Sequence, residues 1–183
     1  MERRIRFLEL LHRMEIEVKI KIENIEKLKD KLAEQGAALI KERYQEENTL
    51  FDFLSKSLYK RRCALRLRVE NRKTFLTFKG PPLKSRKFKI RQEYETEIKN
   101  EKQCRKILKE LGFIPSFSYK KRRSVYKKKN LKICLDETSI GNFMELEGER
   151  QDIVRFARSL NFSKEDFIKL DYIQLIGKER KNL

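Results

Sequence analysis

Apolar and charged residues alternate with period two in segment after segment of this chain. The first such segment, Glu15-Ile16-Glu17-Val18-Lys19, puts its apolar side chains on one face and its charged side chains on the other. This alternation is typical of a half-buried β-strand. One charged face is ordinary where a sheet meets solvent. Many such faces, with charges of both signs and few neutral residues, favour a polar interior that the strands share.

Parity within each later segment places further charged residues on common faces. These groups are Arg66 with Arg68; Thr77 with Lys79; Arg91 with Glu93, Glu95 and Glu97; Lys121 with Arg123; Lys132 with Cys134 and Asp136; and Phe143 with Glu145 and Glu147. The opposite faces are apolar and can pack beneath helices. They carry Leu65, Leu67 and Val69; Leu76 and Phe78; Ile133 and Leu135; and Met144 and Leu146.

Capping residues and turn residues divide the chain into short strands and helices. Asn24 and Asn100 each precede a helical pattern, ended by Gly36 and Gly112, and Asp171 can cap a last helix. The remaining expected elements are strands at 37–42, 65–69, 74–79, 87–99, 118–126, 131–136 and 142–149, an extended stretch at 45–52, a loop at 53–60, a helix at 151–160 and a capping box from Ser163. Strands joined by short turns predict one α+β domain on a large antiparallel sheet, which can close into a barrel.

Composition bounds the class of protein. The 183 residues suffice for one domain with a real core, and the net charge of +18 favours polyanionic ligands such as phosphates, nucleic acid or an acidic membrane surface. No apolar run is long enough to span a membrane. Residues 1–13 are too charged for a secretory signal and are expected to form an N-terminal extension. We place a single domain at 14–178 and a tail at 179–183.

Several kinds of chemistry are excluded by the residues that are present. His12 is the single histidine, which excludes histidine-based triads and multi-histidine metal sites. The three cysteines, Cys63, Cys104 and Cys134, are widely spaced and odd in number, which favours free thiols in a reducing cytoplasm. Neither a P-loop nor a dinucleotide-binding glycine motif occurs.

Carboxylates and cations that share an interior need compensation, because buried charge is costly unless it is paired or hydrated. A polyphosphate with its divalent metal uses both sets at once. Arginine and lysine bind phosphate oxygens, and carboxylates bind Mg²⁺ or Mn²⁺, which also contact the phosphates. If the charged faces instead look outward, they form a charged surface and no more.

The same residues resemble the CYTH superfamily of triphosphate tunnel metalloenzymes, which includes CyaB-like class IV adenylyl cyclases, thiamine triphosphatase and inorganic triphosphatases. Glu15-x-Glu17-x-Lys19 is similar to the ExExK signature of that family. A lone ExExK would be weak evidence, but further motifs follow in the family's order. They are Asn48-Thr49-Leu50-Phe51-Asp52, Leu65-Arg66-Leu67-Arg68, Leu76-Thr77-Phe78-Lys79, Arg91-Gln92-Glu93-Tyr94-Glu95, Lys121-Arg122-Arg123, Asp136, residues 141–148 and residues 171–175. Leu50 departs from the aromatic residue of many members, and Asp171 from the usual serine.

The resemblance implies an eight-stranded antiparallel barrel with helices packed outside and a charged interior. By the family's roles, divalent metal would be bound by Glu15, Glu17, Glu145 and Glu147, with Asp136, Glu93 and Glu95 assisting. The triphosphate would be bound by Lys19, Arg66, Arg68, Lys79, Arg91, Lys121 and Arg123. We expect Lys19, Glu17 and Arg66 to act in catalysis itself.

The resemblance therefore implies a cytoplasmic, Mg²⁺- or Mn²⁺-dependent enzyme that acts on tripolyphosphate, thiamine triphosphate or ATP, as a monomer or homodimer. We favour hydrolysis of inorganic or organic triphosphate. The alternative is a CyaB-like adenylyl cyclase that makes cyclic AMP and pyrophosphate, the branch that the stretch 120–126 most resembles. Remote alternatives are a basic nucleic-acid-binding protein, against which the alternating carboxylates argue, and a polyphosphate sensor without turnover.

Overall fold

The computed structural model describes residues 14–179. The predicted N-terminal extension, 1–13, and residues 180–183 of the predicted tail lie outside the described residues. The described chain consists of the elements β1 (Met14–Ile22), α2 (Ile25–Glu34), β2 (Ala38–Asp52), α3 (Ser57–Lys60), β3 (Ala64–Glu70), β4 (Lys73–Lys79), β5 (Lys89–Ile98), α4 (Glu101–Glu110), β6 (Ile114–Lys128), β7 (Leu131–Thr138), β8 (Gly141–Glu147), α5 (Arg150–Ser159), the 3₁₀ helix η1 (Lys164–Asp166) and α6 (Tyr172–Glu179).

The eight strands form a closed barrel in the order β1-β5-β4-β3-β2-β6-β7-β8. Within it, β1–β8, β3–β4, β4–β5, β6–β7 and β7–β8 pair antiparallel, with Lys19 opposite Glu145 and Thr77 opposite Glu95. The predicted fold class, an antiparallel barrel with helices, is confirmed. Within residues 14–179, none of the helices has the length and apolar character needed to cross a membrane.

The chain divides into two compact units that interleave along the sequence. Unit 1 comprises, among the described residues, 14–15, 47–84 and 90–119, and unit 2 comprises 16–46, 85–89 and 120–179. Strands β1, β2, β5 and β6 contribute residues to both units. Each unit has its own apolar core.

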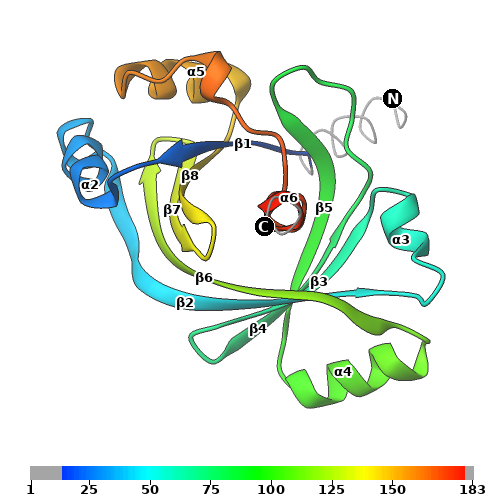
Figure 1. Ribbon diagram of the computed structural model, residues 1–183. Coiled ribbons are helices and arrows are strands. Elements are labelled where there is room, and N and C mark those ends of the chain that lie inside the picture. Colours follow the sequence, from blue (N-terminus) through cyan, green and yellow to red (C-terminus); the bar gives the residue numbers. More distant parts are fainter. Residues whose placement is uncertain (1–13, 180–183) are drawn as a thin grey trace, which may run out of the picture. The chain divides into compact units, whose positions relative to one another are not determined.

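Helices α2 and α5 bury their apolar faces against the strands of unit 2. Leu28 and Leu32 of α2 and Ile153 and Phe156 of α5 share one core with Ile133 of β7. Figure 1 shows these two helices on one side of β1, β7 and β8, with α6 on the other side of the same strands. Because each strand alternates, this packing turns the charged faces of β1, β7 and β8 away from α2 and α5.

The smaller core of unit 1 is built on α4. Cys104 and Leu108 of this helix pack with Phe51 of β2 and Leu67 of β3. Leu67 was predicted to face the helices, and it is fully buried. The charged residues two positions apart on β3, Arg66 and Arg68, therefore project to the other face of the strand.

Local sequence signals account for the starts of three helices. The side chains of Asn24 and Asn100 accept hydrogen bonds from the amides at Lys27 and Gln103, which confirms both predicted caps. Asp171 caps α6 in the same way, by accepting from the amide of Gln174.

Two local expectations differ from the structure. Residues 38–52 form one long strand, because no glycine or proline interrupts the alternation there. Four residues of the predicted loop 53–60 form α3, ahead of which Asp52 accepts from the amides of Leu58 and Tyr59. The predicted capping box at Ser163 is confirmed, and it opens the short 3₁₀ helix η1.

Candidate functional site

The first charged cluster lies in unit 1, on the polar faces of β3, β4 and β5, with Glu15 from β1. Strand register places Thr77 opposite both Arg66 and Glu95, and places Lys79 opposite Glu93. We define this cluster as Glu15, Arg66, Arg68, Thr77, Lys79, Arg91, Glu93 and Glu95.

Lys79 links two carboxylates of the first cluster. Its ammonium lies 2.9 and 2.8 Å from the two carboxylate oxygens of Glu15 and 2.5 Å from Oε2 of Glu93. The guanidinium of Arg91 approaches Glu15 to 3.8 Å. Burial alone would raise the pKa of Glu93, but Lys79 and Arg66 outweigh it and leave that pKa below its ordinary value. Glu93 therefore stays ionised at neutral pH.

Glu95 is held by both arginines of β3. Its carboxylate accepts from Arg68 at 2.7 Å and from Arg66 at 3.5 Å, and the hydroxyl of Thr77 donates to it at 2.6 Å. Arg68 also donates to Glu70 at 2.8 Å. These contacts hold the two guanidinium groups in defined positions on one face of the sheet.

The second charged cluster lies in unit 2, on the polar faces of β1, β6, β7 and β8, with one residue each from β2 and β5 and two from the start of α6. Its cations and carboxylates are buried or partly buried, and one aromatic residue from α6 lies among them. We define this cluster as Glu17, Lys19, Glu46, Lys89, Lys121, Arg123, Asp136, Glu145, Glu147, Asp171 and Tyr172.

Asp136 is the centre of this second cluster. It is fully buried and accepts from Lys121 at 3.1 Å, from Nε of Arg123 at 2.6 Å and from the hydroxyl of Tyr172 at 2.6 Å. Lys121 lies 3.5 Å from Glu46, whose side chain is also fully buried. With several donors around it, Asp136 fixes the position of two cations that were predicted to bind phosphate.

Glu145 lies between Arg123 and one further predicted phosphate ligand, Lys19. Its carboxylate is 2.6 Å from Arg123 and 3.2 Å from the ammonium of Lys19. Burial would raise the pKa of Glu145, but Arg123, Lys19 and Lys121 together hold it well below its usual range. Lys19 in turn lies 3.4 Å from Glu17.

Lys89 belongs to the same group, although sequence reasoning missed it. Its ammonium is buried, 3.6 Å from Glu17 and 3.3 Å from Asp171. Lys89 has the parity of Arg91 on the alternating segment, and this signal could have identified it. Glu46 and Tyr172 were also missed as members of the site. Glu46 has the parity of Asn48 on β2, and this signal could have identified it, whereas Tyr172 lies on a helix, where strand parity gives no signal.

The carboxylates of β1 and β8 supply oxygen donors on a common face. Glu17 is opposite Glu147 in the register, and Glu145 is two residues from Glu147. Such all-oxygen sets suit Mg²⁺ and Mn²⁺, so the donor chemistry fits the implied metal. Within residues 14–179, however, no three potential metal ligands are gathered around a common point. The site carboxylates contact lysine or arginine instead, as Glu147 does with Lys132 at 2.8 Å.

All of the predicted site residues thus lie in one of two charged clusters. Glu15, Arg66, Arg68, Lys79, Arg91, Glu93 and Glu95 are in the first, and Glu17, Lys19, Lys121, Arg123, Asp136, Glu145 and Glu147 are in the second. Cys134, on the polar face of β7, is a buried thiol whose pKa rises to about 11, chiefly through burial. It is therefore a neutral neighbour of the charged residues and not a nucleophile.

Comparison with known proteins places this geometry in a family. The CYTH domain model matches residues 13–169. A Methanocaldococcus jannaschii protein named as a candidate adenylate cyclase is 31% identical over 175 residues, spanning 90% of this chain and 99% of that protein.

Solved structures show the same fold. A candidate adenylate cyclase from Vibrio parahaemolyticus superposes with a TM-score of 0.80 at 19% identity, covering 90% of this chain and 98% of that one. A Hippeastrum candidate adenylyl cyclase, described by its dominant triphosphatase activity, gives a TM-score of 0.68 at 21% identity, covering 90% and 96%. With the family model matched over most of its length and its charged motifs gathered on the polar faces of a closed barrel, this chain belongs to the CYTH domain family.

Proposed function

We propose that this protein is a divalent-metal-dependent enzyme that acts on a triphosphate, and that its main reaction is hydrolysis. The observation that carries the proposal is the burial of many lysine, arginine and carboxylate groups in alternating contact, such as Arg123–Glu145–Lys19. Burying ion pairs in this number does not by itself favour stability. A ligand with several negative charges and a bound cation would use both sets of groups.

Each cation of the clusters can exchange its carboxylate partner for a phosphate oxygen. Lys19, Lys121 and Arg123 are held by carboxylates within 3.5 Å, so they are pre-oriented before a ligand arrives. Arg66 and Arg68 can each form bidentate hydrogen bonds with a phosphate group. We assign triphosphate binding to Lys19, Arg66, Arg68, Lys79, Arg91, Lys121 and Arg123.

The carboxylates released from these pairs would hold the metal. We assign that role to Glu15, Glu17, Glu145 and Glu147, with Asp136, Glu93 and Glu95 assisting. A bound Mg²⁺ or Mn²⁺ supplies charge neutralisation on the phosphates and activation of water. Lys19 and Arg66 stabilise the negative charge that builds up on the transferred phosphoryl group, and Glu17 keeps Lys19 in position through their 3.4 Å contact.

Hydrolysis and cyclisation differ in which phosphorus is attacked. Water attack on the terminal phosphorus releases phosphate, whereas attack by a ribose 3′-hydroxyl on the α-phosphorus gives cyclic AMP and pyrophosphate. The named activity of the Hippeastrum protein favours the first for a barrel of this kind. The name of the Methanocaldococcus jannaschii relative keeps adenylyl cyclase as the second candidate.

Product analysis separates these reactions. The full chain is incubated with tripolyphosphate, thiamine triphosphate or ATP, with Mg²⁺, with Mn²⁺ or with a chelator. We expect metal-dependent release of phosphate. If cyclic AMP and pyrophosphate are the main products formed from ATP, the protein is an adenylyl cyclase and the proposal of hydrolysis is wrong. Tight binding of tripolyphosphate without turnover would make the protein a sensor.

We further propose that the enzyme works in the cytoplasm as a monomer or homodimer. The buried free thiols of Cys63, Cys104 and Cys134 support a reducing compartment. Nucleic acid is not the expected substrate, because buried carboxylates share the polar faces with the cations and would repel its backbone.

A further inference from the structure

A separate basic pocket lies on the exposed side of α5, in unit 2. It has a volume of about 500 Å³ and is lined mainly by side chains of α5, together with one residue before β5 and one from η1. Neither charged cluster contributes to the lining. The residues that matter here are Phe88, Arg150, Val154, Arg155, Arg158 and Lys164.

Four of these side chains carry positive charge, and none of the lining residues is acidic. Among the pocket cations, Arg155 lies 3.7 Å from the carboxylate of Asp152, which is itself partly exposed. Glu165, the residue after Lys164, forms an ion pair with Lys87 at 2.6 Å, outside the pocket lining. The pocket therefore keeps a surplus of positive charge that suits an anion with several charges.

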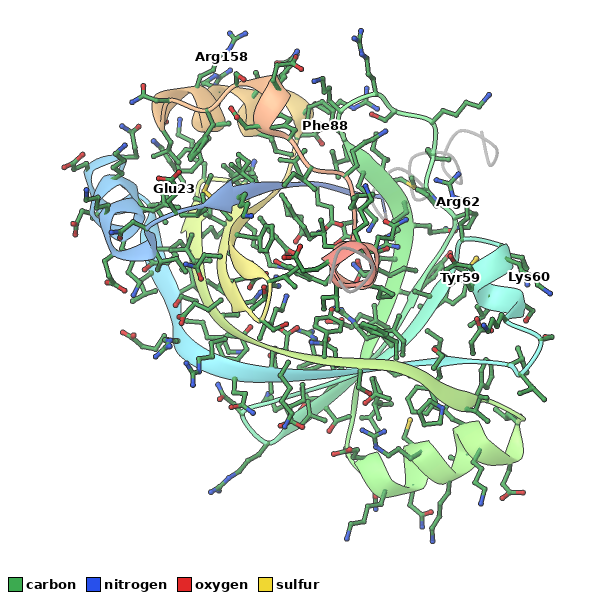
Figure 2. All side chains as sticks on the ribbon, viewed as in Figure 1. Glu23, Tyr59, Lys60, Arg62, Phe88 and Arg158 are labelled. Carbon is green, nitrogen blue, oxygen red and sulfur yellow. The ribbon has the colours of Figure 1, made fainter. Side chains whose placement is uncertain are left out.

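An aromatic wall accompanies this charge. Phe88 is fixed edge-on against the buried ring of Phe167, with the ring centroids 5.8 Å apart. The guanidinium of Arg150 lies 6.0 Å from the centre of the Phe88 ring. Arg158 extends outward from α5, and Phe88 lies beside the same helix (Figure 2). Together with Val154, these groups form an apolar and π-rich wall beside the cations.

The neighbouring face of α5 is anchored in the core, which makes the pocket a fixed surface. Ile153 is fully buried, and Phe156 and Ala157 are buried beside it. The lining residues of α5 follow helical spacing along the border of this face, from Arg150 through Val154 to Arg158, and Val154 also packs against the core. A ligand would thus meet these side chains on a rigid helix.

We propose that this pocket binds a nucleotide at a site distinct from the charged clusters of the barrel. Phosphates would contact Arg155, Arg158 and Lys164, and the base would lie against Phe88 and the Arg150 guanidinium. The volume suits one small ligand. Phe88 is the one aromatic group among the described lining residues, so the pocket offers a platform for a single base rather than for a strand.

Amide chemical-shift mapping on the ¹⁵N-labelled full chain tests this proposal, with ADP as the probe. We expect ADP to shift the amides around Phe88, Val154 and Arg158. The double variant Arg155→Glu/Arg158→Glu should weaken this binding by about tenfold or more, because charge-assisted contacts to phosphate are lost and reversed. The matched control is Lys102→Glu/Lys106→Glu on α4, which makes the same change in net charge at exposed positions.

Three outcomes would overturn the proposal. One is a set of ADP-dependent shifts confined to residues of the charged clusters, and another is an equal loss of affinity in the control variant. The third is a single-stranded RNA hexamer that binds the same amides more tightly than ADP does. Phe88→Leu tests the base contact: it should weaken ADP binding but leave pyrophosphate binding unchanged, and an equal effect on both would remove the base from the proposal. Because the readout is binding, these results are independent of the reaction in the barrel.

Discussion

The hydroxyl of Tyr172 donates a 2.6 Å hydrogen bond to the buried carboxylate of Asp136. The ring of Tyr172 also has the ammonium groups of Lys19 and Lys121 at 5.2 and 4.9 Å from its centre. Burial and the negative charge of Asp136 raise the pKa of Tyr172 well above its ordinary value, so the hydroxyl stays a donor. The first residue of α6 is thereby tied to the centre of the second charged cluster.

Replacing Tyr172 by Phe should lower stability without removing any charge. Asp136 would keep Lys121 and Arg123 as donors, so we expect a loss of about 1.5–3 kcal/mol, the usual range for a hydrogen bond to a charged group. Urea unfolding measures this loss. Tyr59→Phe is the control, because Tyr59 is largely exposed on α3. An unchanged unfolding midpoint in Tyr172→Phe would show that the bond contributes nothing.

The fold could be predicted from the sequence because strand alternation fixes which side chains share a face. Arg66 and Arg68 were assigned to the face opposite Leu67, and the structure has them there, holding Glu95 while Leu67 is buried. The caps at Asn24 and Asn100 were equally visible, since each depends on a local bond between a side chain and an amide three residues away.

The site residues that were not predicted from the sequence are those positioned by contacts between distant segments of the chain. Lys89 meets Asp171 across more than eighty positions of the chain, and Tyr172 meets Asp136 from a helix with no alternation to place its side chain. The sequence likewise could not predict which cation each site carboxylate contacts. Parity identifies the face, but register and closure of the sheet decide which charges touch.

Arg66→Ala should abolish turnover of the preferred triphosphate. Removing one cation that stabilises transition-state charge costs about 100-fold or more in rate, and Arg66 has a partly buried side chain with Thr77 and Glu95 as partners. Steady-state rates with circular dichroism as a folding check measure the effect. Arg122→Ala is the matched control, because Arg122 is exposed and has the opposite parity to Arg123. Full activity in Arg66→Ala would remove Arg66 from the site.

Glu145→Gln should weaken divalent-metal binding. The substitution keeps the shape of the side chain but removes the charge that now faces Arg123 and Lys19. We expect Mn²⁺ affinity, measured by titration calorimetry with tripolyphosphate present, to fall by about tenfold or more through loss of one charged oxygen ligand. The control is Glu97→Gln, at an exposed position of β5, and this variant should bind Mn²⁺ as tightly as the unmodified chain does. Equal affinity in Glu145→Gln would place the metal on other carboxylates.

Because of Asp52, the free energy of unfolding should decrease as the pH falls into the acid range. Its carboxylate accepts from the amides of Phe53 at 2.7 Å, Leu58 at 3.0 Å and Tyr59 at 2.9 Å. Burial would raise the pKa of Asp52, but these amide bonds outweigh it and leave the pKa below its ordinary value. A pKa lowered by folding gives stability that is complete above the unfolded value, about 3.9, and is lost as pH falls below it.

Asp52→Asn tests this dependence directly. The amide has one acceptor oxygen in place of two, so at pH 7 we expect a loss of about 1–3 kcal/mol in the free energy of unfolding. That difference should shrink as the pH approaches 3, because the carboxyl of the unfolded wild-type chain then takes up a proton and the advantage of the folded carboxylate declines. Urea unfolding at both pH values measures it, with Asp30→Asn on the exposed side of α2 as the control. A difference that stays constant across this range would mean that Asp52 acts through its shape and not through its charge.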